Sequence, residues 1–578
     1  MAGVDYRTEY SKWRRWPGLS EAERAELAKI ADDAHEIEDR FGKELSFGTG
    51  GMRGVLGVGT NRMNRHTVRR ATMGYASYLL ELVPTAVERG VAIAYDSRIG
   101  SAEFAQEAAH VLASRGIPVY TFDGVRPTPL LSYAVRSLGA AGGVVITASH
   151  NPPEYNGYKV YGEDGVQLLP GEASQIASRA SAITEYLASP DAPKAPVETI
   201  QAGMDEQYLR DLEALIRTIA DKLTPPGSRS GIGVVYTPLH GTGYQLVPAI
   251  LSALGFTDTT VVREQCIPNG EFPTVAYPNP EHPTAYALAQ RRAEELSAQG
   301  RRPEILLATD PDCDRVGVSV WDGVSYRQLT GNQVGVLLTD MLVESAQARG
   351  LDLNRSIVVK TIVSTEMVRA MCAPKGIRVV DTLTGFKYIG ALMGQLDNPG
   401  EEFLLGFEES CGYLTGDLAR DKDAVLASAL VACSAARLAA RGLSLLDRLH
   451  QLFDEYGYFL EDLVSVGVSA SKGAGRTMAS LREAIPESVA GFDVKEVRDY
   501  LEGYSIEMAT GAQRRIDLPR ENCIQLILSD GGKVTLRPSG TEPKLKLYIA
   551  AQASSHPEAS KRVGAITEGM RRLLGVMG

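Results

Sequence analysis

The chain of 578 residues has little of several features that mark large classes of protein. Its six cysteines are dispersed and form no C-x-x-C pair, which argues against a disulfide framework or a zinc knuckle. Acidic residues outnumber basic ones and the formal net charge is -11, so the excess of positive charge that a nucleic-acid partner requires is missing. The nucleotide-binding pattern G-x-x-x-x-G-K-[ST] is also absent.

Long hydrophobic runs are missing as well. The longest uncharged stretch, AVLASALVACSAA from Ala424, ends at Arg437 and is too short to cross a bilayer about 30 Å thick. We expect it to form a buried helix. The first thirty residues are charged throughout and contain no apolar core of the kind a secretory signal needs. These features predict a cytoplasmic protein in a reducing compartment, without a membrane partner.

The composition is that of a folded globular protein. Apolar residues make up 44% and charged residues 23%, while Gly (58) and Pro (29) are close to average usage. The length exceeds what one core normally supports, so we expect three or four domains.

Strand-like and helix-like segments alternate in three successive series. The first begins with VAIAYD at residue 91, the second with GIGVVYT at residue 231, and the third with the helix after Thr330. Such alternation predicts parallel or mixed sheets covered by helices. In all three series the unusual residues follow an apolar strand, and the carboxyl ends of strands are where open α/β sheets bind ligands.

The character of the sequence changes after about residue 455. The segment CIQLILSDGGKVTLRPSGTEPKLKLYIAAQ predicts a hairpin-rich sheet with a Gly-Gly turn, followed by a C-terminal helix. The predicted fold class is therefore three related α/β domains with mixed sheets and a smaller C-terminal α+β domain. We place the domains at residues 1–205, 206–325, 326–455 and 456–578.

The segment TASHNPPEYNGYK follows the apolar strand GVVI and contains Ser149, His150 and Lys159. A serine just past a strand end, held by Asn and Pro, can serve as an exposed nucleophile with nearby groups that balance charge. An ordinary Ser/Asn/Pro turn is the alternative, and the four residues SHNP alone favour that turn.

The segment ATDPDCDRVGVSV carries three alternating acids, Asp310, Asp312 and Asp314, whose side chains point the same way if the segment is extended. Clustered carboxylates repel one another unless a hard cation binds, and oxygen ligands suit Mg²⁺. A calcium loop is disfavoured because Arg315 stands at its glycine position and Trp321 at its glutamate position. An acidic surface turn is the weaker alternative.

The segment GFEESCGYLTGD places Glu408, Glu409 and Ser410 after the strand EFLLGF. Carboxylates and a hydroxyl on a glycine-bounded loop suit the hydroxyl groups of a sugar. A simple acidic turn explains the segment equally well when it is taken alone.

The segment TLRPSGTEPKLK combines cationic groups, hydroxyls and glycine-permitted backbone, in residues Arg537, Ser539, Gly540, Thr541 and Lys544. This mixture suits an oxyanion such as phosphate, because Arg offers a two-pronged donor and loop amides form an anion-binding nest. A polar hairpin loop is the less favoured alternative.

Weaker signals accompany these four segments. FGTGGMRG puts Arg53 in a glycine-rich segment, and TLTGFKYIG puts Lys387 where a strand passes into a helix. Asp96 and Arg98 in YDSRIGS are interpreted as a structural ion pair, and His240 in TPLHGTG as a hydrogen-bonded loop histidine.

Taken together, the four segments resemble the α-D-phosphohexomutase superfamily, and most closely its phosphoglucomutase/phosphomannomutase family with the longer, phosphoglucomutase-2-like chain. TASHNP, DPDCDR, GFEES and RPSGTEP occur in the order of that family, and the likeness covers nearly the whole chain. The resemblance implies four domains around one central cleft.

The resemblance also implies roles for individual residues. Ser149 would carry a phosphoryl group, and Asp310, Asp312 and Asp314 would hold one Mg²⁺ together with it. The residues implied to bind substrate are Arg315, Lys387, Glu408, Ser410, Arg537, Ser539, Gly540 and Thr541. Arg53, His150 and Lys159 match further catalytic positions, and the proton acceptor is left open between His150 and Lys159.

The implied activity is an intramolecular phosphotransfer between glucose 1-phosphate and glucose 6-phosphate, through glucose 1,6-bisphosphate as intermediate and activator. Its partners would be small sugar phosphates, with neither nucleic acid nor membrane. The pair Phe386–Lys387 resembles the aromatic-Lys pair of phosphoglucomutases rather than the His of some bifunctional relatives, and this resemblance favours glucose over mannose. A phosphopentomutase, a phosphomannomutase, a serine-dependent metallophosphatase and a phosphosugar sensor are the alternatives; the intact serine and aspartates disfavour the sensor.

Overall fold

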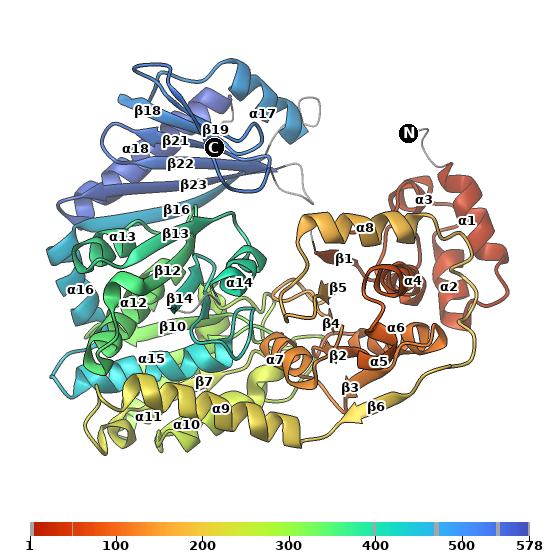
Figure 1. Ribbon diagram of the computed structural model, residues 1–578, viewed down its shortest axis with the longest axis horizontal. Coiled ribbons are helices and arrows are strands. Elements are labelled where there is room, and N and C mark those ends of the chain that lie inside the picture. The colour runs from red at the N-terminus through yellow and green to blue at the C-terminus, as the bar shows by residue number, and fades with distance from the viewer. Residues whose placement is uncertain (1–4, 49, 397–399, 468–472, 539–543, 576–578) are drawn as a thin grey trace.

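Four β-sheets follow one another along the chain, and helices cover each of them (Figure 1). The computed structural model describes residues 5–48, 50–396, 400–467, 473–538 and 544–575. We call the parts built on the successive sheets the first, second, third and last units. Three α/β units with mixed sheets precede a smaller α+β unit, which confirms the predicted fold class. The domain boundaries at residues 205, 325 and 455 stay a prediction.

Three short helices precede the first sheet. They are α1 (Tyr6–Arg15), α2 (Glu21–Lys29) and α3 (Ala34–Phe41). Each begins at a Ser or Asp whose side chain accepts a hydrogen bond from a backbone N–H of the first turn. Their apolar residues, Trp13 and Phe41 among them, form a small core with Val58 of the first unit.

The first sheet has six strands in the order β1-β5-β4-β2-β3-β6. The strands are β1 (Gly51–Val55), β2 (Val91–Tyr95), β3 (Val119–Phe122), β4 (Gly142–Ile146), β5 (Tyr155–Tyr161) and β6 (Val197–Ile200). The helices of this unit are α4 (Arg65–Leu82), α5 (Ala86–Arg89), α6 (Ser101–Ser114), α7 (Thr128–Leu138) and α8 (Pro170–Ser181). The strands from β4 to β6 in this order are parallel, whereas β5 runs antiparallel to both β4 and β1.

The second and third sheets are also mixed. The second has the order β11-β10-β9-β7-β8 and the third β13-β12-β14-β15. The second unit contains β7 (Val234–Thr237), β8 (Thr259–Val261), β9 (Ile305–Thr309), β10 (Val316–Trp321), β11 (Tyr326–Leu329), α9 (Gly203–Ala220), α10 (Leu246–Ala253) and α11 (Ala287–Ala298). The third contains β12 (Ser356–Thr361), β13 (Arg378–Thr382), β14 (Glu402–Glu408), β15 (Gly412–Leu414), α12 (Gly331–Arg349), α13 (Met367–Cys372), α14 (Phe386–Gln395), α15 (Ala424–Ala439) and α16 (Leu445–Tyr456).

Helix α15 is the buried helix predicted from the uncharged run. All its residues from Ala424 to Leu438 are buried, and it packs against helices and strands of both the second and third units. Arg437 is buried within it and forms ion pairs with Asp340 and Glu344 of α12. Within the described residues, no helix is both long and apolar enough to span a membrane.

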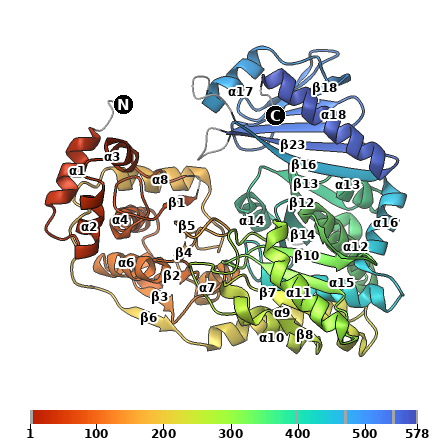
Figure 2. The ribbon, with the colours of Figure 1, turned by 180° about the vertical axis from the view of Figure 1, so that it is seen from behind.

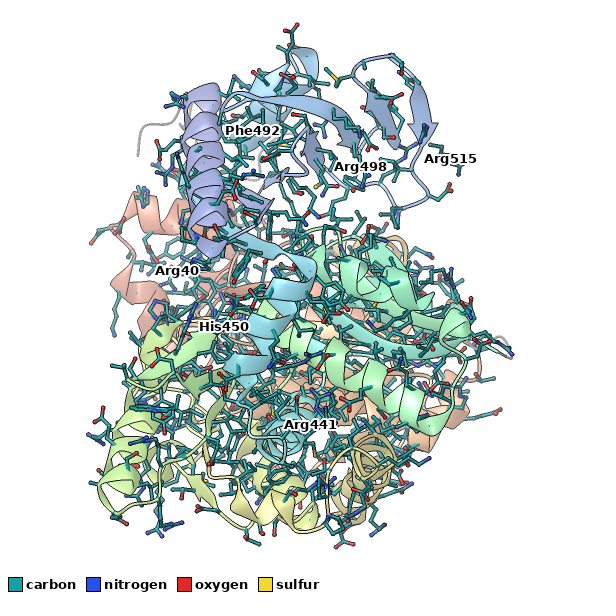
Figure 3. The ribbon with its side chains drawn as sticks, turned by 90° about the vertical axis from the view of Figure 1, so that its left-hand side faces the viewer. Arg40, Arg441, His450, Phe492, Arg498 and Arg515 are labelled. Atoms are coloured by element: carbon teal, nitrogen blue, oxygen red, sulfur yellow. The ribbon has the colours of Figure 1, made fainter. Side chains whose placement is uncertain are left out.

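The last unit is an antiparallel sheet with helices against it. Its main strands follow the order β16-β23-β22-β21-β18-β19-β20. The elements are β16 (Tyr458–Gly467), α17 (Gly473–Glu483), β17 (Ser488–Val489), β18 (Phe492–Asp499), β19 (Tyr504–Glu507), β20 (Gln513–Arg515), β21 (Ile524–Leu528), β22 (Lys533–Pro538), β23 (Lys544–Ala553) and α18 (His556–Leu574). Figure 3 shows this sheet, marked by Phe492 and Arg498, above α16, which carries His450.

The hydrophobic cores group the units unequally. One large core joins residues of the first, second and third units, while the last unit has a core of its own. A small apolar cluster connects the third unit with the last. It includes Ile362 and Leu383 of the third unit and Tyr500 and Tyr548 of the last. Figure 2 shows the same division from behind, with the last sheet above the third unit.

Candidate active site

Ser149 lies on the loop that leaves β4 and returns as β5. The two strands pair antiparallel, with Val145 opposite Lys159, so the strand returning from the serine loop carries the lysine. Ser149 has φ 53°, in the left-handed region that costs a non-glycine residue about 1 kcal/mol or more. Its backbone N–H donates to Thr147 Oγ1 at 2.7 Å, which helps to hold this conformation.

The hydroxyl of Ser149 contacts the second unit directly. Ser149 Oγ donates a hydrogen bond to Asp310 Oδ2 at 2.7 Å and lies 3.2 Å from His150 Nδ1. The serine and the first aspartate are therefore brought together from loops 161 positions apart in the sequence.

The three aspartates lie on the turn between β9 and β10. Each is buried, and each offers a carboxylate oxygen to a cluster in which these oxygens lie within 4.8 Å of one another. At such distances two unit charges repel by more than about 3 kcal/mol, for an effective dielectric constant of about 20. Asp310 Oδ1 also accepts hydrogen bonds from the backbone N–H groups of Asp314 and Arg315, at 3.1 and 3.0 Å.

Two lysines offset part of this negative charge. Lys159 Nζ lies 2.9 Å from Asp312 Oδ2, and Lys422 Nζ lies 2.9 Å from Asp314 Oδ2. Burial would raise the pKa of Asp312, but Lys159, together with Asp310 and Lys422, outweighs that effect and lowers it. Burial, followed by the charges of Asp312 and Asp314, raises the pKa of Asp310.

The remaining free oxygens fit a metal ion. Asp312 Oδ1 and Asp314 Oδ1 are buried and, among the described residues, find no hydrogen-bond partner. Asp310 accepts three hydrogen bonds, as a carboxylate does, so a bound cation explains the cluster better than a proton. An all-oxygen donor set suits a hard divalent cation.

Glu408 and Ser410 come from the third unit, where β14 ends. The backbone N–H of Val316 donates to Cys411 O at 3.1 Å, which ties this loop to the strand that follows the aspartates. Glu408 is buried and lies 4.0 Å from Lys422, whereas Glu409 turns away and accepts from Thr361 Oγ1 at 3.0 Å. Burial, followed by Glu408, raises the pKa of Glu409 to about 7. Of the two glutamates, Glu408 therefore faces the aspartate cluster.

Three predicted basic residues surround the serine loop and the aspartates. Arg53 on β1 donates to Asn151 Oδ1 at 2.8 Å, and Arg315 pairs with Glu281 at 3.0 Å. Burial, followed by Arg315 and Arg53, lowers the pKa of His150. The site thus combines buried carboxylates with a cationic rim, an arrangement that suits a phosphoryl group beside a metal ion.

Lys387 and Arg537 approach each other from the third and last units. Lys387 lies in the first turn of α14, and Arg537 at the end of β22 pairs with Glu521 at 2.5 Å. Burial lowers the pKa of Lys387 to about 8, Glu521 opposes this effect and Arg537 adds to it. Ser539, Gly540 and Thr541, predicted to complete a phosphate loop, lie outside the described residues.

The structure adds residues that the sequence reasoning missed. Lys422 contacts Asp314, and Thr128 Oγ1 donates to Asp312 Oδ2 at 3.1 Å. Lys422 lies in the run ARDKDA before α15, and a lysine between two aspartates was the one signal that the sequence offered for it. As expected, His240 has both ring nitrogens within hydrogen-bond distance of partners, Ile267 O and Thr274 Oγ1.

Comparison with known proteins gives the class of this fold and site. Residues 44–187, 206–323 and 330–456 match the models of alpha/beta/alpha domains I, II and III of phosphoglucomutase/phosphomannomutase. The chain therefore belongs to the phosphoglucomutase/phosphomannomutase family of the α-D-phosphohexomutase superfamily. It is an intramolecular phosphotransferase of the isomerase class.

Individual relatives share most of the chain. A Staphylococcus aureus (strain bovine RF122 / ET3-1) phosphoglucomutase is 35% identical over 547 residues, which cover 92% of this chain and 94% of the relative. A Staphylococcus epidermidis phosphoglucomutase is 36% identical over 530 residues, or 89% of this chain and 92% of the relative. A solved structure from Thermus thermophilus, provisionally named a phosphomannomutase, is 26% identical with a TM-score of 0.66 and covers 92% and 99% of the two chains.

Lys387 is expected to lose its charge near neutral pH. Because its pKa is lowered to about 8, the ammonium is cationic below that pH and a neutral, nucleophilic amine above it. Trace acetylation with acetic anhydride, followed by peptide mass spectrometry at each pH, should give a reactivity midpoint near 8 for Lys387. The exposed Lys12 is the reference in the same spectra, and a Lys387 midpoint at or above pH 10 would contradict the prediction.

Proposed function

We propose that this enzyme is a phosphoglucomutase that interconverts glucose 1-phosphate and glucose 6-phosphate through phospho-Ser149 and glucose 1,6-bisphosphate. The observation that carries the proposal is the contact of Ser149 Oγ with Asp310 at 2.7 Å, which puts a nucleophilic hydroxyl against a buried cluster of carboxylates. Two Staphylococcus relatives named phosphoglucomutase support the choice of glucose. We also propose that the enzyme works in the cytoplasm, on small sugar phosphates.

The aspartates would hold one Mg²⁺ together with the phosphate of Ser149. The first candidate ligands are the Oδ1 atoms of Asp312 and Asp314, which accept no hydrogen bond from the described residues, and Asp310 would complete the protein's share. When bound, Mg²⁺ supplies positive charge to the transferring phosphoryl group.

The protein's own cations would neutralise the rest of that charge. A phosphoserine carries about -1.5 to -2 charges at pH 7, so a sugar oxygen is repelled until cations surround it. We assign Arg53 and Arg315 to this task, because they lie around the serine loop and the aspartates. His150, whose pKa is lowered by burial, is neutral and lies beside Ser149 Oγ. The acceptor for the proton of the attacking hydroxyl stays open between His150 and Lys159, and Lys159 would first have to lose the proton that it holds beside Asp312.

The sugar and its second phosphate would be bound by the third and last units. We assign the sugar hydroxyls to Glu408 and Ser410, and the non-reacting phosphate to Arg537, Ser539, Gly540 and Thr541, with Lys387 beside them. Arg537 lies close enough to Lys387 to help lower its pKa. The bisphosphate must turn end over end between its two transfers, so this second phosphate site has to accept either end.

Ser149→Ala is expected to abolish the interconversion, with a loss of at least about 1,000-fold, because no other hydroxyl in this position can carry the phosphoryl group. Intact-mass spectrometry of the wild-type protein should show a phosphate-sized increment that the variant lacks. Ser137→Ala, on the exposed end of α7, is the control and should retain both activity and increment. An active Ser149→Ala enzyme, or steady release of inorganic phosphate by the wild type, would contradict the proposed reaction.

Removal of divalent metal with EDTA is expected to abolish activity, and added Mg²⁺ should restore it. Asp312→Asn should raise the Mg²⁺ concentration for half-maximal activity by about tenfold or more, because one anionic ligand is lost. Asp417→Asn, at a side chain 62% exposed, is the matched control. Equal metal requirements in the two variants would argue against the assignment.

The sugar preference is tested by comparing kcat/KM for glucose 1-phosphate, mannose 1-phosphate and ribose 1-phosphate, with glucose 1,6-bisphosphate present. Glucose 1-phosphate should be preferred by about tenfold or more, because a site built to bind particular hydroxyls rejects analogues that misplace them. A preference for ribose or mannose would leave the mutase reaction in place but replace the substrate.

A further inference from the structure

Arg98 is a buried residue of the first unit, and its guanidinium binds the backbone of the serine loop. It follows β2, and its side chain is fully buried. Nη2 donates to the carbonyl oxygens of Ser149, at 2.6 Å, and of Asn151, while Nη1 donates to those of Pro152 and Tyr155, at 2.8 and 3.0 Å. One guanidinium therefore binds four backbone carbonyl groups of the loop that runs from Ser149 to the start of β5.

These contacts use the donors of the arginine almost completely. A guanidinium has five N–H groups in a fixed planar arrangement. Four point at loop carbonyls, whereas Nε lies 3.3 Å from Asp96 Oδ2 in an ion pair without a hydrogen bond. A lysine has three donors on a single atom and cannot reproduce this pattern. The ion pair of Asp96 and Arg98 that the sequence predicted is present, but it involves only one of the five N–H groups of the arginine.

The second unit packs against Arg98 from the other side. The ring of Phe272 lies 5.0 Å from Arg98 Cζ, although Phe272 must adopt a left-handed conformation (φ 46°) to be there. Gly270 comes so close that a β-carbon on it would lie 2.7 Å from the Arg98 carbonyl carbon. The same connection, which runs from β8 to α11, also carries Glu281, the partner of Arg315.

We propose that Arg98 positions Ser149, and that residues 270–272 of the second unit hold Arg98 in place, a role that we call seating. Together these contacts fix the position of the serine relative to the aspartates. Arg98 is fully buried and cannot touch the sugar phosphate, so it acts through the loop backbone. Its four bonds hold the left-handed Ser149 with Oγ toward Asp310. The inference rests on the proposed role of Ser149 as phosphoryl carrier.

Arg69 offers a matched control for a purely structural arginine. It lies in the same unit, its side chain is 3% exposed, and it pairs with Glu107 at 2.6 Å. Its Nη1 donates to the carbonyl oxygens of Tyr186, Leu187 and Ala188. Arg69 thus repeats the chemistry of Arg98, several backbone carbonyls and one carboxylate, at a loop that carries none of the predicted site residues.

The test compares Arg98→Met and Arg98→Lys with Arg69→Met. The two methionine variants should lower the Tm by similar amounts. Both Arg98 variants should lower kcat by about tenfold or more while KM for glucose 1-phosphate changes less than about threefold, because the pocket residues are intact and only the serine is misplaced. Arg69→Met should keep kcat within about twofold of the wild type. An unchanged kcat in the Arg98 variants, or an equal loss in Arg69→Met, would overturn the proposal.

A second variant tests whether residues 270–272 hold Arg98 in place. It keeps the proposal testable if the Arg98 variants do not fold. Gly270→Ala changes no residue of the first unit, but its β-carbon would lie 2.4 Å from the backbone nitrogen of Ile99, so the two backbones must separate beside Arg98. It should lower kcat by about fivefold or more at unchanged KM. Gly231→Ala in the same unit, where a β-carbon would meet nothing within 4 Å, should not. Equal kcat in the two glycine variants would refute the seating.

Failure of this inference is distinguishable from failure of the proposed function. If wild-type protein forms no glucose 6-phosphate from glucose 1-phosphate and carries no phosphate on Ser149, the function is wrong. If wild-type protein does both and the Arg98 and Gly270 variants do so at the wild-type kcat, only the positioning role is wrong.

Discussion

The mutual repulsion of three buried carboxylates is the constraint on which the rest of the site depends. Asp310, Asp312 and Asp314 lie on one turn of the second unit, and that unit does not supply enough positive charge or hydrogen bonds for them by itself. Lys159 and the Ser149 hydroxyl come from the first unit, and Lys422 comes from the third. The chemistry of one turn therefore requires three units to meet, and those three units share one hydrophobic core.

The turns at this meeting point are held in conformations that non-glycine residues rarely adopt. Ser149, Cys313 and Cys411, one on each of the three described loops, have φ between 52° and 64°. Each such residue costs about 1 kcal/mol or more, so the neighbouring backbone must offset it. Hydrogen bonds do so: Arg98 binds the carbonyl of Ser149 within the first unit, while Val316 binds that of Cys411 and Ala424 that of Cys313 between the second and third units. The left-handed loop residues and the contacts between units therefore occur at the same positions, and the contacts help to hold the unfavourable backbone conformations.

Strand periodicity was enough to predict the fold class and the loops that carry Ser149, the aspartates and Glu408, because each follows an apolar strand and the carboxyl ends of strands gather ligands. Lys159 could be predicted as a site residue for the same reason, since it lies on the strand that returns from the serine loop. Lys422 and the contacts of Arg98 were not, because they depend on which surfaces of separate units face each other. Nothing in YDSRIG shows that an arginine followed by a helix will reach four carbonyl groups more than fifty residues away.

The attachment of the last unit follows a different physical rule from the other three. Besides a small apolar cluster and the packing of Tyr458 and Phe459 against the large core, it meets the third unit through polar contacts. Examples are the hydrogen bonds of Lys533 Nζ and Gln525 Nε2 to the single carbonyl of Ile362. Polar contacts of this kind exchange with water at a net cost of about 1 kcal/mol each, whereas separating the shared core of the first three units would expose a large apolar area. The proposed reaction, whose intermediate turns over, would need one part of the site fixed and another able to release. On this division of contacts, the serine and the aspartates belong to the units that share a core, and Arg537 on β22 belongs to the unit attached mainly by polar contacts.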